Sequence, residues 1–355
     1  MHGRPTASDA PRRPSTPPQA GALHIPFAAG TSTSALLHSD PVDDGLFTSA
    51  DLRAMGFERP ERETAVTRAR RGVYGSGDLH PGGTTEAFLT LIHAADRTLT
   101  GTRIYSHESA AALLGLPIWG WWPKQIDLIC ERSSGGRTQR DVVRHCVGLE
   151  HVVPEVVDGM LVTSPGRTAF DIALCRPFES AVILADAAFR DHPGARAEFA
   201  ALLKAYGRRR GFRKAERVLG FADERSGSPG ESKSRVEIDR LGFERPDLQV
   251  VVTTDGREEF ADFGWKRHRA LGEYDGEEKY RLDRYRRGGT IDDVVMREKN
   301  RENRMRRSYP NFARWDTEDP RERRLAGILL AARVPKRAGG SPPPSARYSP
   351  PRRGR

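Results

Sequence analysis

Long apolar segments are absent from this sequence. No uninterrupted apolar run approaches the roughly 20 residues that a membrane-spanning helix needs. The opening stretch, MHGRPTASDAPRRPSTPPQAGA, also lacks the apolar centre of a signal peptide. We therefore expect a cytoplasmic protein that does not bind membranes.

Cysteine is scarce as well. The three cysteines, Cys130, Cys146 and Cys175, lie far apart and show none of the short spacings that indicate a zinc site or a redox pair. A cysteine without such a spacing is most often a small buried apolar side chain. We expect all three to be of this kind, in a reducing compartment.

Acidic residues are outnumbered by basic ones, and the formal net charge is +10. Such an excess suggests an anionic partner such as nucleic acid. Residues 335–355 supply +6 of this charge, because the segment has six basic residues and no acid. A Pro-rich basic tail is more often solvated than a specific site, although it can add salt-sensitive affinity for phosphate.

Composition and periodicity divide the chain into five parts and predict a mixed α/β fold. The two ends, 1–43 and 335–355, lack hydrophobic periodicity and are expected to be disordered. Between them we expect a winged-helix-like DNA-binding segment at 44–80, a middle α/β domain at 81–222 and a third domain at 223–334.

The pattern of segment 44–80 is that of a small winged helix-turn-helix. Thr48 or Ser49 can cap a helix that turns Leu52 and Met55 inward, and residues 62–68 allow a second helix. RARRGVY then predicts a basic, strand-forming wing. A small helical cap with a solvated basic face fits the pattern equally well. The wing arginines that we expect to contact DNA are Arg68, Arg70 and Arg71.

The middle domain offers helices and strands but no recognisable nucleophile, metal cluster or phosphate loop. Two features bear on binding. His107 stands at a predicted helix start, where a lone histidine is more often structural than functional. Trp121 and Trp122 could stack on nucleobases, although a buried aromatic corner is the simpler interpretation.

The third domain reads in the order α-β-β-β-α-α-β and has acids inside ADFGWKRHRALGEYDGEEKY, where strands usually contain few. If Trp265 pairs with Ala270, Asp262 lies opposite Glu273 at a Cβ separation of about 4.5–5.5 Å. Asp275 then shares that face. Like charges so close need a compensating cation, and oxygen-rich sites suit Mg²⁺ or Mn²⁺.

Two simpler interpretations of these acids stay open. Asp275 and Glu278 have the spacing of a capping box for the following helix. Glu273 could pair with an arginine instead of a metal ion.

The sequence at this point resembles the PD-(D/E)XK nuclease fold, in the branch of the very-short-patch repair endonucleases and small bacterial relatives. The matching text is SPGESKSR, ADFGW and LGEYDGEEKY. The resemblance implies that Asp262 and Glu273 hold a divalent metal ion, Mg²⁺ or Mn²⁺. It also implies a further acid from the first helix, Glu231, with Glu237 as second choice.

The sequence departs from this family where a lysine usually follows the Glu by two residues, because Asp275 stands there. Lys279 is the candidate replacement, which makes Asp262, Glu273, Asp275 and Lys279 the implied catalytic group. The metal would polarise a phosphate oxygen and activate water, and Lys279 would stabilise the developing charge. Candidate phosphate contacts, with a solvated helix face as the alternative, are Arg284, Arg286 and Arg287.

The whole-chain layout resembles actinobacterial proteins related to the AbiEi-type antitoxins of type IV abortive-infection systems. The matching text is RRGVY, SHESAAALLGLP at 106–117 and TSPGRTAFDIA at 163–173. The resemblance spans roughly 45–316.

Two functions follow from these resemblances. One is a DNA-binding protein with metal-dependent phosphodiester hydrolysis, in phage defence or DNA repair. The other is a non-catalytic antitoxin or transcriptional regulator, with a cognate toxin as partner and a degenerate nuclease fold as scaffold. A structural protein with non-specific anion affinity is the plainest alternative.

Overall fold

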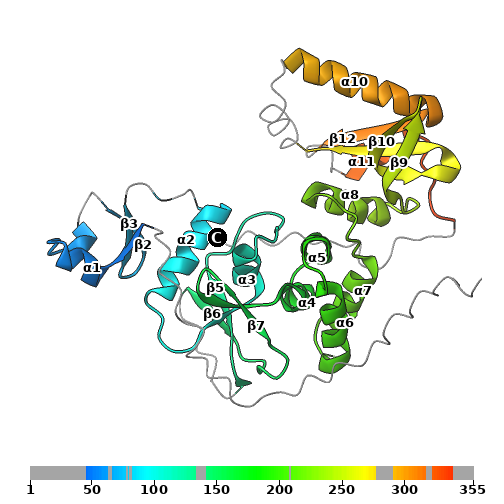
Figure 1. Ribbon diagram of the computed structural model, residues 1–355. Helices are drawn as coiled ribbons and strands as arrows, with labels where there is room; N and C mark the ends of the chain where they lie inside the picture. The colour runs from blue at the N-terminus through cyan, green and yellow to red at the C-terminus, as the bar shows by residue number, and fades with distance from the viewer. Residues whose placement is uncertain are drawn as a thin grey trace, which may run out of the picture. The chain divides into compact units, whose positions relative to one another are not determined.

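The computed structural model describes residues 45–62, 66–76, 79, 82–132, 141–207, 209–276, 291–316 and 322–338. These residues form helices and three sheets, which confirms the expected mixed α/β class (Figure 1). No helix in the described part of the chain has the length and apolar character needed to cross a membrane.

A small antiparallel sheet opens the described chain. Its strands have the spatial order β1-β3-β2. Thr48 caps the helix that follows the first strand, and its hydroxyl oxygen accepts the backbone N–H of Asp51 at 3.2 Å. The elements are β1 (Leu46–Thr48), α1 (Ser49–Ala54), β2 (Val66–Arg70) and β3 (Val73–Ser76).

Two predictions for this segment are wrong. The second helix expected over 62–68 does not form, because a 3₁₀ turn ends at Arg62 and β2 begins at Val66. Met55 is 59% exposed and lies past the end of α1, so only Leu52 is buried there. The predicted strand-forming wing is confirmed as the β2–β3 hairpin.

The middle domain has a five-stranded sheet of order β6-β5-β4-β8-β7. Phe88 and Ile92 of α2 pack with Tyr105 and Leu128 of the sheet in one core. The elements are α2 (Thr85–Asp96), β4 (Ile104–Tyr105), α3 (His107–Leu113), β5 (Ile126–Ile129), β6 (Val142–His145), β7 (Pro154–Val157) and β8 (Met160–Thr163).

A helical layer follows the sheet, and its core holds Phe170, Phe199 and Val218. As the sequence predicts, α4 has Ser164 as its cap and Pro165 at its first position, where the missing N–H is harmless. The helices are α4 (Pro165–Cys175), α5 (Phe178–Asp191), α6 (Ala195–Tyr206) and α7 (Phe212–Phe221).

The third domain is a four-stranded sheet of order β12-β11-β10-β9 with helices on both faces (Figure 1). Met305 of α10 packs with Val250 and Leu271 on one face. Ile238 of α8 and Leu325 of α11 belong to the core of the other face. The elements are α8 (Pro229–Arg240), β9 (Asp247–Thr254), β10 (Arg257–Trp265), β11 (Ala270–Asp275), α10 (Ile291–Ser308), β12 (Asn311–Asp316) and α11 (Glu322–Ala331).

The predicted order of the third domain is confirmed wherever the residues are described, and only the helix expected to start near 277 lies outside them. The parallel pairing of β11 with β12 brings Trp315 over Gly272. A Cβ at Gly272 would lie 2.7 Å from the Trp315 ring, so only glycine fits this close approach.

The predicted start of the disordered tail at residue 335 is wrong. Lys336 pairs with Phe243 in an isolated antiparallel bridge, and Arg337 donates to the Asp239 carboxylate at 2.8 Å. This short segment therefore belongs to the folded third domain.

Candidate functional site

The predicted register of the β10–β11 hairpin is confirmed, because Trp265 pairs with Ala270. The regular pairing ends at Phe263 and Gly272, one step before the two acids. Asp262 instead turns its Oδ2 atom to accept the backbone N–H of Tyr274 at 2.9 Å. The carboxylate of this buried acid therefore satisfies a backbone donor.

The irregularity at Asp262 has a counterpart on the neighbouring strand. Gln249 lies between two regular β9–β10 pairs and has a φ of 48°, in the left-handed region. Ala261 packs on the α10 face, whereas Phe263, two residues later, packs on the α8 face. A regular strand would keep both side chains on one face. The irregularity at Asp262 and Gln249 therefore turns Phe263 to the opposite face from Ala261.

Glu273 is 5% exposed and has an arginine on each carboxylate oxygen. Arg301 of α10 donates from Nη2 to Oε1 at 2.6 Å, and Arg314 of β12 donates from Nη2 to Oε2 at 2.7 Å. Burial raises the pKa of Glu273, and the two guanidinium groups oppose that rise. The cation that the paired acids required is here supplied by arginine, the alternative that the sequence left open.

Further ion pairs extend this cluster across the α10 face. Arg314 Nε lies 3.3 Å from Asp275 Oδ2, and its Nη1 lies 3.6 Å from Glu302 Oε2. Arg301 also donates to the carbonyl oxygen of Phe260 at 2.9 Å. We call Glu273, Asp275, Arg301 and Arg314 the carboxylate–arginine cluster.

The expected metal site does not fit this arrangement. Among the described residues, no three His, Cys, Asp or Glu side chains converge closely enough to hold a metal ion. Each Glu273 oxygen already binds a guanidinium, so a metal ion would have to displace Arg301 or Arg314. Lys279, the expected charge-stabilising residue, lies outside the described residues.

The two candidate helix acids have local partners. The Ser228 hydroxyl accepts the N–H of Glu231 at 3.2 Å and donates to its Oε1 at 3.0 Å. Glu231 Oε2 accepts the N–H of Gly227 at 2.8 Å and Gln249 Nε2 at 3.1 Å. Glu237 pairs with Arg240 at 2.7 Å. Both acids therefore have structural roles on α8.

The arginines predicted to contact DNA differ in exposure, and some of them lie outside the described residues. Arg68 and Arg71 are exposed on the β2–β3 hairpin, whereas Arg70 is half-buried and its Nη2 donates to Asp141 at 3.2 Å. Arg284, Arg286 and Arg287 lie outside the described residues.

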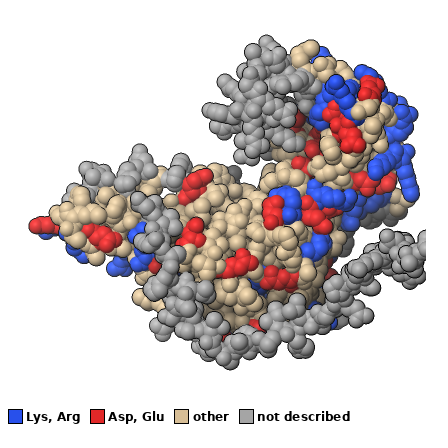
Figure 2. Space-filling view, in the orientation of Figure 1, with Lys and Arg blue, Asp and Glu red and all other residues tan. Residues whose placement is uncertain are grey.

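A basic surface that the sequence analysis missed lies at one end of the third domain. Arg269 donates to the carbonyl oxygen of Ser308 at 2.9 Å, which ties the turn between β10 and β11 to the end of α10. Figure 2 shows Lys and Arg side chains gathered over this domain. The signal for it in the sequence is KRHR, where three basic residues stand together in one turn. We call this surface the basic end; it comprises Lys266, Arg267, Arg269, Arg306 and Arg307.

His107 belongs to a buried polar group of the middle domain. Its ring stacks on His145 at a centroid distance of 3.7 Å, and His145 Nε2 lies 2.8 Å from Asp127 Oδ1. Burial, and then the charge of His145, lowers the pKa of His107. These contacts support the structural interpretation of this histidine.

The expected aromatic corner holds for Trp122 and is wrong for Trp121. Trp122 stacks on Phe88 with centroids 5.1 Å apart and donates to Thr85 Oγ1 at 3.0 Å. Trp121 is 81% exposed.

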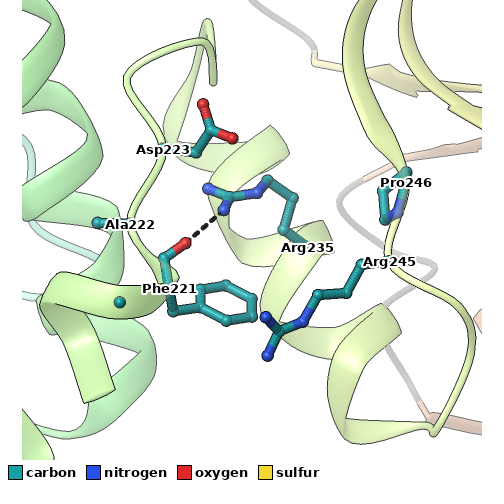
Figure 3. Close-up of a pocket in the computed structure, with 7 residues that line it drawn as sticks. Phe221, Ala222, Asp223, Arg235, Arg245 and Pro246 are labelled. Carbon is teal, nitrogen blue, oxygen red and sulfur yellow. Dashed lines mark hydrogen bonds between the residues drawn. The ribbon is translucent and has the colours of Figure 1, made fainter. Parts of the chain in front are cut away.

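A small pocket of about 180 Å³ lies beside Phe221 (Figure 3). The guanidinium groups of the two arginines that line it are bonded to neighbouring residues. Arg235 donates to the carbonyl oxygen of Phe221 and to Asp186, both at 2.6 Å, and Arg245 donates to Asp239 at 2.8 Å. Both guanidinium groups also lie over the Phe221 ring.

Comparison with known proteins gives relatives but no function. No family model matches the chain. Two Mycobacterium tuberculosis proteins described as uncharacterized, Rv2248 of strain H37Rv and MT2308 of strain CDC 1551, are each 36% identical over 122 residues. The match spans 34% of this chain and 44% of the length of each relative. The crystal structure of the RV2827C protein from the same species overlaps 57% of this chain and 78% of its own, at 17% identity and a TM-score of 0.33.

Proposed function

We propose that this protein binds nucleic acid and that its nuclease-like third domain is a non-catalytic scaffold. The role would be that of an antitoxin-like transcriptional regulator, with DNA and a cognate toxin as partners. One observation carries the proposal: both oxygens of Glu273 are held by Arg301 and Arg314, where a nuclease would hold its metal ion.

The basic end supports nucleic-acid binding. Lys266 and Arg267 are exposed and form no ion pair within the described part of the chain. Arg306 pairs with Glu302 and lies 4.9 Å from the centre of the Phe312 ring. Arg307 pairs with Asp255, so contacts hold both of these side chains in place. Such a surface suits phosphate contacts, which fix position but do not read sequence.

The wing arginines offer a second, separate set of contacts. Arg68 and Arg71 are exposed on the β2–β3 hairpin, while Arg70 is ion-paired with Asp141. We assign the first two to DNA and the third to holding the hairpin.

Metal-dependent hydrolysis is the second candidate. The order of helices and strands and the neighbouring Asp262 and Glu273 favour it. It requires Arg301 and Arg314 to leave Glu273 when metal and DNA bind.

Fluorescence anisotropy with labelled double-stranded oligonucleotides, measured over a range of salt concentrations, tests nucleic-acid binding. The variant Lys266→Ala/Arg267→Ala should bind more weakly. Its salt slope should fall by roughly 0.9 per lost phosphate contact. The matched control, Lys204→Ala/Arg213→Ala, removes the same charge from exposed positions on α6 and α7 and should bind like the wild type. Equal losses in both variants would mean a non-specific charge effect and would contradict the assignment to the basic end.

A cleavage assay with Mg²⁺ or Mn²⁺ separates the two candidates. The non-catalytic proposal expects DNA binding without cleavage. Metal-dependent cleavage that is lost in Glu273→Gln, with the fold retained, would establish the nuclease instead.

A further inference from the structure

Two of the three cysteines meet at the edge of the middle sheet. Cys130 follows β5 and Cys146 follows β6, and the parallel register of these strands places Ile129 opposite His145. The two Sγ atoms are 2.8 Å apart. The expectation of three separate buried cysteines is therefore wrong, and Cys175 is the exposed one.

The backbone around the pair already suits a covalent bond. The N–H of Cys130 donates to the carbonyl oxygen of His145 at 3.0 Å, which continues the strand pairing up to the cysteines. Neighbouring strands lie about 4.8 Å apart, inside the range of about 4.4–6.8 Å between the Cα atoms of a disulfide. Bond formation therefore needs no large movement of either strand.

We propose that Cys130 and Cys146 form a reversible disulfide when the protein meets a hydroperoxide. A thiolate of the pair attacks one peroxide oxygen, the O–O bond breaks, and an alcohol or water leaves with a proton from solvent. The sulfenic acid so formed is attacked by the second sulfur, and its oxygen leaves as water with the second thiol proton. The two thiols lose two electrons, and the peroxide gains them.

The surroundings set the speed of this step. Burial and the hydrogen bond with Cys146 raise the pKa of Cys130 to about 11. Its reactive thiolate is therefore rare at neutral pH. We therefore expect oxidation to be slow at neutral pH and to accelerate as the pH rises.

The bond would act on an edge strand. β6 is one of the two outer strands of the five-stranded sheet, and it pairs with β5. His145, the residue before Cys146, holds Asp127 and stacks on His107. A disulfide would fasten β6 to β5 beside this group, so the oxidised protein should unfold at a higher temperature.

Thiol titration and peptide mapping after treatment with hydrogen peroxide test the proposal on the full chain. The wild type should fall from three titratable thiols to one and yield a linked peptide pair containing Cys130 and Cys146. Dithiothreitol should restore all three thiols. Cys175→Ser should still form the link, whereas Cys130→Ser and Cys146→Ser should not.

Other results would overturn the proposal. These are retention of the Cys130 and Cys146 thiols while Cys175 oxidises, or sulfinic acid on either residue without the linked peptide. Because the decisive readout is the linked peptide of the wild type, poor folding of a serine variant would not affect the conclusion. An unchanged melting temperature with the link formed would contradict the stabilising role.

Discussion

Arg314 lies directly opposite Glu273 in the parallel pairing of β11 and β12 and donates to its Oε2 atom at 2.7 Å. Arg301 reaches the other oxygen from α10, on the face of the sheet that this helix covers. One buried carboxylate thus joins three elements of the third domain. Through these ion pairs the carboxylate–arginine cluster holds α10 and β12 to β11.

The first prediction concerns this cluster. Arg314→Met should lower the free energy of unfolding by about 2 kcal/mol, because it leaves one oxygen of a buried carboxylate without its charged partner. Urea unfolding measures the loss. Glu273→Gln in the same chain should recover part of it, since the unpaired charge is removed.

A matched control for that experiment is Arg306→Met. Arg306 also pairs with a glutamate, but its side chain is 41% exposed. Exposed pairs contribute about 0–1 kcal/mol, so the control should stay near the wild type. Equal losses at Arg306 and Arg314 would argue against a special role for Glu273.

The second prediction concerns acid stability. The pKa of His107 is lowered in the folded protein, so this ring binds a proton in the unfolded chain first, near its ordinary pKa of about 6.5. Stability should therefore fall as the pH drops below that value, by up to about 1.4 kcal/mol per pH unit from this one group.

His107→Asn isolates the contribution of His107, because asparagine tolerates the positive φ of 50° at this position and does not titrate. Urea unfolding at pH 7.5 and 5.5 should show a smaller loss in the variant than in the wild type. The charged groups that act on this ring, His145, Arg167 and Arg176, are present in both proteins, so the comparison isolates the proton that His107 itself binds. Identical losses in both proteins would contradict the assignment.

The third prediction contrasts two adjacent tryptophans. Trp121→Ala should change stability by less than about 0.5 kcal/mol, because the side chain is 81% exposed. Trp122→Ala should cost about 2 kcal/mol, less than a fully buried aromatic, because it removes the stack on Phe88. Thermal unfolding of the two variants gives the comparison, and equal costs would contradict it.

The fourth prediction concerns the end of the folded chain. Truncation after residue 338 should leave stability unchanged, whereas truncation after Val334 should cost about 1–3 kcal/mol. The shorter chain loses the pairing of Arg337 with Asp239 and the Lys336 ammonium that lies 3.6 Å from the centre of the Phe243 ring. Urea unfolding of the two truncated chains measures the difference. A stable chain ending at Val334 would return residues 335–338 to the tail.

Local signals in the sequence were enough to predict the elements of the third domain. The turn at KRHR predicted the pairing of Trp265 with Ala270. Such signals act over a few residues, through caps, turns and the alternation of apolar side chains. They failed over 62–68, where a short helical pattern competes with strand pairing to β3.

The sequence by itself determined that Asp262 and Glu273 would lie on neighbouring strands and that Glu273 would need a cation. Only the tertiary structure decided which cation, because Arg301 and Arg314 are 28 and 41 residues away and are two among 58 lysines and arginines. Only the tertiary structure likewise brings Cys130 and Cys146 together, because the parallel pairing of β5 with β6 has no signal in the local sequence. Contacts between distant segments depend on how sheets and helices assemble, and spacing along the chain does not record that assembly.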